Sequence, residues 1–154
     1  MKMILHRGFV KNPLSTVRIT LNNKTLKGEW VIGYYFQHRH RTECKNKKGN
    51  TVNQILKDMH CIIPYPSTNV IQYVEVIPET VCTYTEKTDK NFRPIFEGDF
   101  IKNIKTNQLY EVFWDDYNLQ FFFVHGNNRK TFDDFNENEY KIVGNKFENA
   151  EVAE

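Results

Sequence analysis

Short segments in which apolar and polar side chains alternate limit how this chain can fold. Val17, Ile19 and Leu21 alternate with polar neighbours in residues 16–21. Successive side chains of a strand point to opposite faces, so this period of two predicts a strand with one buried face. The chain also holds 12 Phe and 8 Tyr, side chains that favour pleated, half-buried surfaces. A mainly β protein is therefore predicted.

A hairpin is predicted over residues 109–127. Its arms, "LYEVFW" and "LQFFFV", flank "DDYN", whose Asp and Asn favour turns because they bond to nearby backbone groups. Such hairpins predict a strongly bent antiparallel sheet or a small barrel in the C-terminal half. Further strands are predicted in four segments, of which the third is split by a bend: 29–38, 69–77, 94–104 and 140–147.

One short helix is predicted near 51–60. Thr51 and Gln54 have the spacing of a capping box, which satisfies free amide donors at a helix start. Apolar residues follow at the spacing i, i+3, i+4 and i+7, namely Val52, Ile55, Leu56 and Met59. A single helical turn is also predicted within 131–139, and the tail 148–154 is expected to fray.

The net charge of +2 conceals a difference between the two parts of the chain. Residues 1–60 hold 12 Lys and Arg against three acidic residues, a net +9, whereas residues 61–154 carry a net −7. Such a division indicates a polyanion partner, head-to-tail self-association into a homo-oligomer, or two solvated surfaces. The sequence leaves these three readings open.

The segment 38–50, "HRHRTECKNKKGN", concentrates the basic charge. Cations that neutralise phosphates beside rings that stack on bases are typical of RNA and single-strand binding. The alternative is a solvated hairpin tip. The candidate nucleic-acid-binding residues are Arg39, Arg41, Lys45, Lys47 and Lys48, with Tyr34 and Tyr35 as stacking rings.

An acidic segment, 132–140, is the counterpart of this basic one. It could mimic phosphates or dock a basic protein surface, and it could equally be a solvated loop. Its candidate partner-binding residues are Asp133, Asp134, Glu137 and Glu139.

No catalytic residue, metal or cofactor is predicted. Glu97 and Asp99 could share one face of a strand, but Gly98 between them favours a bend in which Asp99 bonds a backbone amide. His38, His40, Cys44, His60 and Cys61 are zinc-ligand types, yet their spacing matches no zinc motif, and the sequence leaves open whether they ever bind a metal. The chain also lacks a phosphate-binding glycine loop and a serine-nucleophile motif. An enzyme is not expected.

Composition also bears on compartment. Three cysteines are an odd number without a disulfide pattern, and the apolar run at residues 3–5 is much shorter than a signal-peptide core. No segment approaches the roughly 20 apolar residues of a membrane span. A cytoplasmic protein without membrane contact is expected.

Five segments together resemble the YopX family, small proteins carried mainly by phages and prophages. They are "HRGF" (6–9), "GEWVIGYY" (28–35), "VIPETV" (76–81), "TDKNFRPIFEGDFIK" (88–102) and "YKIVGNKFEN" (140–149). The resemblance implies a β-rich fold and a phage origin, and it implies no catalytic residues. Cys82 and Glu86 stand where the family pattern commonly has glycine.

The resemblance spans nearly the whole chain except about residues 37–70. This suggests one YopX-like domain over 1–154 with two lobes: a basic lobe, 1–75, that carries the variable insert 37–70, and an acidic β unit, 76–150. A specialised partner would be recognised through the insert.

The expected function is that of a non-enzymatic phage accessory protein in the host bacterial cytoplasm. It would bind and modulate or inhibit a host protein or ribonucleoprotein complex, for example a CRISPR-type defence complex as an anti-CRISPR. Two alternatives are a direct RNA- or DNA-binding protein of phage replication or regulation, and a structural homo-oligomer.

Overall fold

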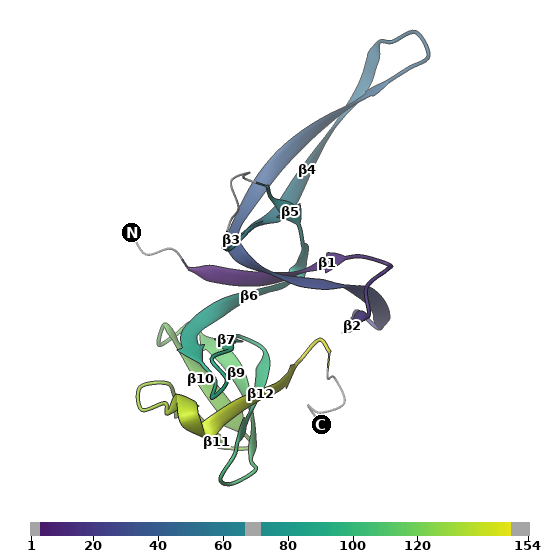
Figure 1. Cartoon of the computed structure of the whole chain (residues 1–154). Helices are drawn as coiled ribbons and strands as arrows, with labels where there is room; N and C mark the ends of the chain where they lie inside the picture. The colour runs from purple at the N-terminus through teal and green to yellow at the C-terminus, as the bar shows by residue number, and fades with distance from the viewer. Residues whose placement is uncertain (1–3, 67–71, 149–154) are drawn as a thin grey trace.

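The computed structural model describes residues 4–66 and 72–148, which form two antiparallel sheets (Figure 1). The first sheet has the strand order β5-β4-β3-β1-β6-β7, with β2 paired to β3. Its strands are β1 (Leu5–Lys11), β2 (Val17–Leu21), β3 (Lys24–Lys45), β4 (Thr51–Pro64), β5 (Val74–Glu75), β6 (Ile77–Thr88) and β7 (Pro94–Phe96). The prediction of a mainly β protein is confirmed.

The second sheet has the order β11-β10-β9-β8-β12. This sheet is open. Of the two predicted forms, the bent sheet is therefore confirmed and the small barrel is wrong. A closed barrel would require β11 to pair with β12, whereas these two strands are the opposite edges of the sheet. The strands are β8 (Asp99–Asn103), β9 (Leu109–Asp115), β10 (Gln120–His125), β11 (Asn128–Thr131) and β12 (Tyr140–Asn145), with the 3-10 turn η1 (Glu137–Glu139) before β12.

The predicted hairpin is confirmed as β9 and β10, paired from Gln120 with Asp115 to Val124 with Glu111. Its turn depends on Asp115, whose Oδ1 accepts hydrogen bonds from the amides of Tyr117 at 2.9 Å and Asn118 at 3.1 Å. The bonding of turn amides by a short carboxylate is the behaviour that the sequence pattern relied on.

Each sheet has its own apolar core. Around the first sheet, Phe9, Ile19, Cys82, Phe96 and Phe147 form a buried cluster. Phe147 follows the last strand of the second sheet, and the amide of Thr20 in β2 donates to its carbonyl at 2.9 Å. The core of the second sheet is aromatic and aliphatic: Ile95, Ile101, Tyr110, Val112, Phe123, Phe132 and Tyr140. Residues near β12 and β7 therefore help to join the two layers.

The helix predicted near 51–60 is wrong, because this segment is the first part of β4. It pairs with β3 without interruption from Gly33 opposite Pro64 to Cys44 opposite Asn53, and a bulge separates that pair from Lys45 opposite Thr51. An isolated helix of this length is marginal unless its apolar face is buried. Here no core lies beneath the segment, since Val52, Ile55 and Leu56 are 63%, 49% and 55% exposed.

The turn that joins β3 to β4 is well specified. Asn46 Oδ1 accepts from the amides of Lys48 and Asn50, each at 3.0 Å, and Gly49 has a φ of 83°, which glycine adopts without strain. The strand β3 then pairs with β4 along its length, apart from the one bulge. The hairpin turn and the neighbouring strand thus override the helical spacing of the side chains.

The helical turn predicted within 131–139 is confirmed as η1. Two predictions fall largely outside the described residues: the start of the strand over 69–77 and nearly all of the tail 148–154. In the described part of that strand, Val74–Glu75 is β5 and Ile77 is the first residue of β6. Glu86, one of the two departures from the family pattern, has a φ of 69°, a conformation that favours glycine.

The close pairing of β3 and β4 at Gly33 gives the first prediction. A Cβ at Gly33 would lie 1.9 Å from the carbonyl oxygen of Ile63, so Gly33→Ala must displace backbone. We expect it to lower the free energy of unfolding by about 1–3 kcal/mol in urea titrations. Thr20→Ala, at an exposed position of β2, is the control and should change stability little. Equal stability of the two variants would contradict the register described here.

Candidate functional site

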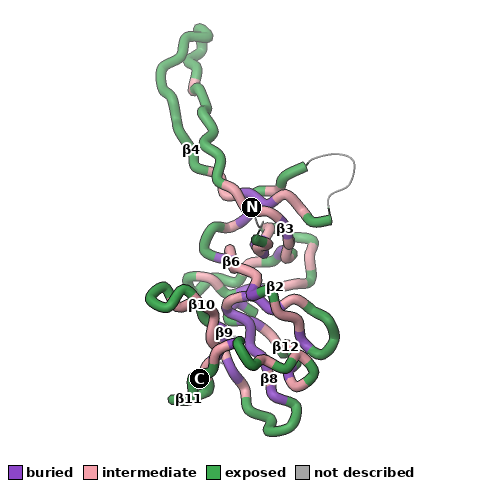
Figure 2. The backbone as a smooth tube through the Cα atoms, turned by 90° about the vertical axis from the view of Figure 1, so that its left-hand side faces the viewer, coloured by how far each residue is buried: buried purple, intermediate pink, exposed green. Residues whose placement is uncertain are grey.

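The outer part of the β3–β4 ribbon projects from the body of the protein (Figures 1 and 2). Residues 37–59, named the arm here, contain the whole projecting part, and almost every residue in it is exposed. Below the arm, β3 is covered by β1, which pairs with it from Leu5–Tyr34 to Lys11–Gly28. The arm contributes little to either core and is available for contact with a partner.

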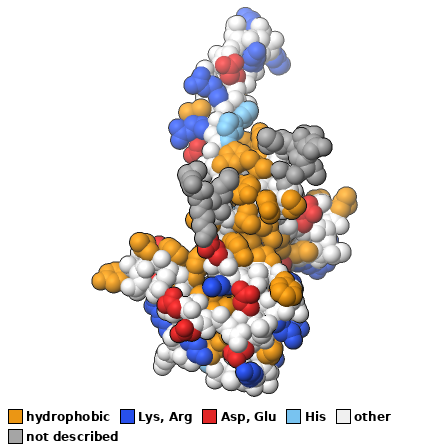
Figure 3. Space-filling view, turned by 60° about the vertical axis from the view of Figure 1, so that its left-hand side comes forward, with side chains coloured by type: hydrophobic (Ala, Val, Ile, Leu, Met, Phe, Trp, Pro, Cys, Tyr) orange, Lys and Arg blue, Asp and Glu red, His pale blue; other side chains and the backbone are white. Residues whose placement is uncertain are grey.

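Basic side chains are concentrated on the arm, as Figure 3 shows. It holds six Lys and Arg residues against Glu43 and Asp58. Arg39 Nε lies 2.9 Å from Asp58 Oδ1, and Lys57 Nζ lies 3.0 Å from Glu75 Oε1. These pairs are exposed and screened by solvent, so they contribute little to folding.

The remaining cations of the arm are free to meet an anion. Within the part of the chain that is described, no ion pair involves Arg41, Lys45, Lys47 or Lys48. The three lysines lie at or next to the tip, where the turn holds them apart from the acidic residues of the body. The structure therefore brings together the five basic residues that the sequence singles out on one projecting element.

Tyr34 and Tyr35 lie at the root of the arm, on opposite faces of β3. The ring of Tyr34 packs edge-on against Tyr65 at 5.8 Å. The ring of Tyr35 stacks on His60 at 6.0 Å, and its hydroxyl lies 2.6 Å from His60 Nδ1. Both rings thus already contact protein, and they lie apart from the lysines of the tip.

The zinc-ligand types of this region are also dispersed. His60 is bonded to Tyr35, Cys61 is fully buried, and the His38 and His40 rings are 6.4 Å apart on one face of the arm. Among residues 4–66 and 72–148, no three His, Cys, Asp or Glu side chains gather in a way that could hold a metal ion.

The acidic candidates lie between β11 and β12, and three of them have partners within the protein. Glu137 accepts from the hydroxyl of Thr88 at 3.0 Å, and Glu139 Oε1 lies 2.8 Å from Lys105 Nζ. Asp133 accepts from Thr131 at 3.3 Å. Three of the four acidic side chains therefore make contacts that stabilise the loop before β12.

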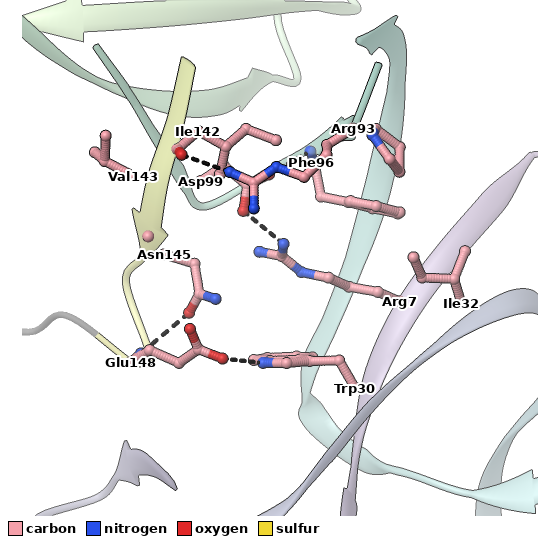
Figure 4. A pocket seen from close by; sticks show the side chains of 12 residues that line it. Arg7, Trp30, Ile32, Arg93, Phe96, Asp99, Ile142, Val143, Asn145 and Glu148 are labelled. Carbon is pink, nitrogen blue, oxygen red and sulfur yellow. Dashed lines mark hydrogen bonds and ion pairs between the residues drawn. The ribbon is translucent and has the colours of Figure 1, made fainter. Parts of the chain in front are cut away.

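A second feature is the junction between the two sheets, where Arg7 of β1 meets Asp99 of β8 (Figure 4). Arg7 Nη1 lies 2.5 Å from Asp99 Oδ1, and the two side chains are only 10% and 1% exposed. The guanidinium also lies over the rings of Trp30 at 4.9 Å and Phe96 at 5.0 Å. Burial raises the pKa of the Asp99 carboxyl, and the charge of Arg7 offsets part of this.

The predicted bend at Glu97–Gly98–Asp99 is confirmed, with Asp99 in the role expected of it. Gly98 has a φ of 83°, and Asp99 Oδ2 accepts from the amide of Phe96 at 2.8 Å. A cavity of about 400 Å³ adjoins this bend, lined by Arg7, Trp30, Arg93, Phe96, Asn145 and Glu148 among others. None of the described residues that line it is a Ser, Thr or Cys that could act as a nucleophile, and Cys82, which lies nearby in the core, has a pKa raised by burial.

Asp89 fixes the polar turn of "TDKNFR" and was not singled out by the sequence. Its side chain is fully buried, and it accepts from the amides of Asn91, Arg93 and Ile142 at 2.8, 3.0 and 3.1 Å. Burial alone would raise the pKa of Asp89, but these three hydrogen bonds and the charge of Arg93 outweigh it and hold the pKa below its usual value. Asp89 therefore ties the β6–β7 loop to β12.

Comparison with known protein families shows the family to which the chain belongs. The model of the YopX protein family matches residues 34–154, which include the arm and the whole second sheet. The chain belongs to the YopX family. The match begins within β3, so β1 with Arg7 lies outside it.

No curated protein matches the chain. The only helical element in the described ranges is the three-residue η1, so no helix there could cross a membrane.

The Arg7–Asp99 contact gives a stability prediction. Asp99→Asn leaves a buried guanidinium without its counter-charge, and we expect a loss of about 3–5 kcal/mol in urea unfolding. The double variant Arg7→Met with Asp99→Asn should lose less than Asp99→Asn alone, because no buried charge remains. Lys105→Ala, which removes an exposed ion pair, is the control and should cost far less. A double variant that loses as much stability as Asp99→Asn alone, or more, would contradict this role.

The Asp89 turn gives a prediction about pH. Because the pKa of Asp89 is lowered by folding, its stabilisation is present above the unfolded value of about 3.9 and is lost as pH falls below it. Asp89→Asn should lose roughly 1–3 kcal/mol at neutral pH. The difference between wild type and variant, measured by urea titration from neutral to acidic pH, should shrink on acidification. A difference in unfolding free energy that does not change with pH would contradict this role of Asp89.

Proposed function

We propose that this YopX-family protein acts by binding, without catalysis, and that its arm contacts a partner that carries phosphates. The partner is a host nucleoprotein in the bacterial cytoplasm, and the protein is a phage-encoded modulator or inhibitor of it. Inhibition of an RNA-guided defence complex, as an anti-CRISPR, is the specific form of this proposal. The arm is the observation that carries it: an exposed ribbon whose cations are mostly unpaired within the described chain.

The distribution of charge supports a composite partner over a bare polyanion. The basic tip of the arm and the acidic segment before β12 lie at opposite ends of the molecule (Figure 1). A nucleoprotein can offer phosphates to the basic end and basic protein to the acidic end, whereas a bare nucleic acid leaves the acidic end without a partner. Family membership is compatible with this role and does not by itself specify it.

A charge-reversal experiment tests the proposal. The triple variant Lys45→Glu, Lys47→Glu and Lys48→Glu should reduce capture of the partner by at least tenfold, with an unchanged melting temperature, because all three side chains are exposed at or beside the arm's turn. The control variant reverses the charge of Lys11, Lys24 and Lys27, which are exposed on the body. It changes the net charge of the protein by the same amount. Capture is measured by pull-down from a bacterial lysate, with and without nuclease.

The outcomes separate the candidate functions. A host protein retained after nuclease and lost in the arm variant supports the proposal. Nucleic acid alone, lost after nuclease, would instead indicate the second candidate, direct RNA or DNA binding, which the same arm favours. Equal capture by both triple variants would contradict a role for the arm. A homo-oligomer would show as a salt-sensitive assembly in light scattering.

A further inference from the structure

We propose that the arm is a β-ribbon that enters the major groove of duplex DNA, with the face of Arg41 and Gln54 toward the base edges. This rests on the proposed function, in which the arm is the element that meets phosphates, and it names duplex DNA as the polyanion of the nucleoprotein partner. Three properties of the arm lead to it: its width, its lack of Phe, Tyr and Trp, and the chemistry of one face.

The first property is width. Beyond residue 37 the described ribbon is two strands wide, because β1 pairs with β3 only as far as Tyr34 and β5 pairs with β4 only at Cys61 and Ile62. Paired strands lie about 4.8 Å apart. The major groove of B-form DNA, about 12 Å wide, admits a two-stranded ribbon, whereas the deep, narrow major groove of A-form RNA does not.

The second property is the absence of a stacking platform. Proteins that hold single strands usually stack successive bases on aromatic side chains. Residues 37–59 contain no Phe, Tyr or Trp. The Phe and Tyr rings that adjoin the arm lie at its root, where Tyr34, Tyr35 and Phe36 pack against Tyr65, His60 and Tyr73. The arm therefore offers its cations without a Phe, Tyr or Trp platform, and its only rings are those of His38 and His40. This suits a paired duplex better than an unpaired strand.

The third property is the difference between the two faces of the ribbon. The register sets Arg41 opposite Leu56 and Glu43 opposite Gln54, and alternation places these four side chains on one face. In a major groove, Arg pairs with guanine, Gln with adenine, Glu accepts from cytosine, and apolar groups contact the thymine methyl. The other face carries His40 opposite Lys57 and Cys44 opposite Asn53.

The cations divide between two tasks. Arg39 is held by Asp58 at 2.9 Å, while Arg41, one step further toward the tip on the same face, makes no ion pair with another described residue. Lys45, Lys47 and Lys48 at or beside the turn are placed to meet the phosphates that border the groove. Arg41 and Gln54 thus read base edges, and the lysines position the ribbon.

Binding to defined probes tests this directly. The full chain is titrated, by fluorescence anisotropy, into a duplex DNA of about 30 base pairs, roughly three helical turns, with a randomised centre, and into the single strand and the RNA duplex of the same design. We expect the DNA duplex to bind at least tenfold more tightly than the other two. Arg41→Ala with Gln54→Ala should weaken duplex binding at least fivefold. His40→Ala with Asn53→Ala, on the opposite face, is the matched control and should not.

Methylation then identifies the groove. One duplex of fixed sequence, recovered from the bound pool, is treated with dimethyl sulfate, which methylates guanine at N7 in the major groove and adenine at N3 in the minor groove. Interference at guanine N7 in the bound fraction supports the proposal, and interference confined to adenine N3 overturns it.

The same probes separate this inference from the proposed function. Tighter binding to single strands or to duplex RNA, still lost on reversal of Lys45, Lys47 and Lys48, would overturn the duplex-DNA assignment and leave the arm as a polyanion-binding element. Failure to bind any of the three probes would also overturn it. If, in addition, the lysine reversal leaves lysate capture unchanged, the proposed function falls as well.

Discussion

The buried contact between Arg7 and Asp99 joins the two sheets at the point where the chain passes from one to the other. Asp99 serves both partners at once, because one oxygen meets the guanidinium at 2.5 Å and the other holds the amide of Phe96. Arg7 is fixed in turn between the rings of Trp30 and Phe96. The contact holds β1 next to β8. In turn, β1 pairs with the inner part of β3, whose outer part belongs to the arm.

A rigid root makes an exposed ribbon of this length usable for binding. Gly33 allows β3 and β4 to approach closely, and the pair Tyr35–His60 links the two strands just above the body. On the other side, the amide of Tyr65 donates to the carbonyl of Ile32 at 2.9 Å. The arm can therefore present its cations at a defined angle, and less of the binding free energy is spent on ordering it.

Local sequence patterns predicted the features that depend on local physics. The alternation of Val17, Ile19 and Leu21 and the turn of Asp115 and Asn118 both gave the right elements. The bend at Gly98 is also local, since a φ of 83° between two polar residues is a property of the turn itself. The basic composition of the insert likewise identified the residues that the arm exposes.

The failures have a common cause, which is that contacts with other segments decide these structures. Val52, Ile55 and Leu56 have helical spacing, yet the hydrogen bonds of β3 decide the structure of β4. The contact of Arg7 with Asp99 spans 92 positions, and no local pattern indicates it. Tyr34 and Tyr35 are adjacent to basic residues in sequence, but alternation sends them to opposite faces, where other rings already contact them.

Excision of the arm tests the central claim most directly. His38 and Met59 are cross-strand partners, so residues 39–58 can be replaced by Asn-Gly, the pair that favours a two-residue hairpin turn. The account predicts that the shortened protein keeps the melting temperature of the full chain and captures no partner from a lysate. Retained capture would contradict the assignment of binding to the arm, and loss of the folded state would contradict its independence from the two cores.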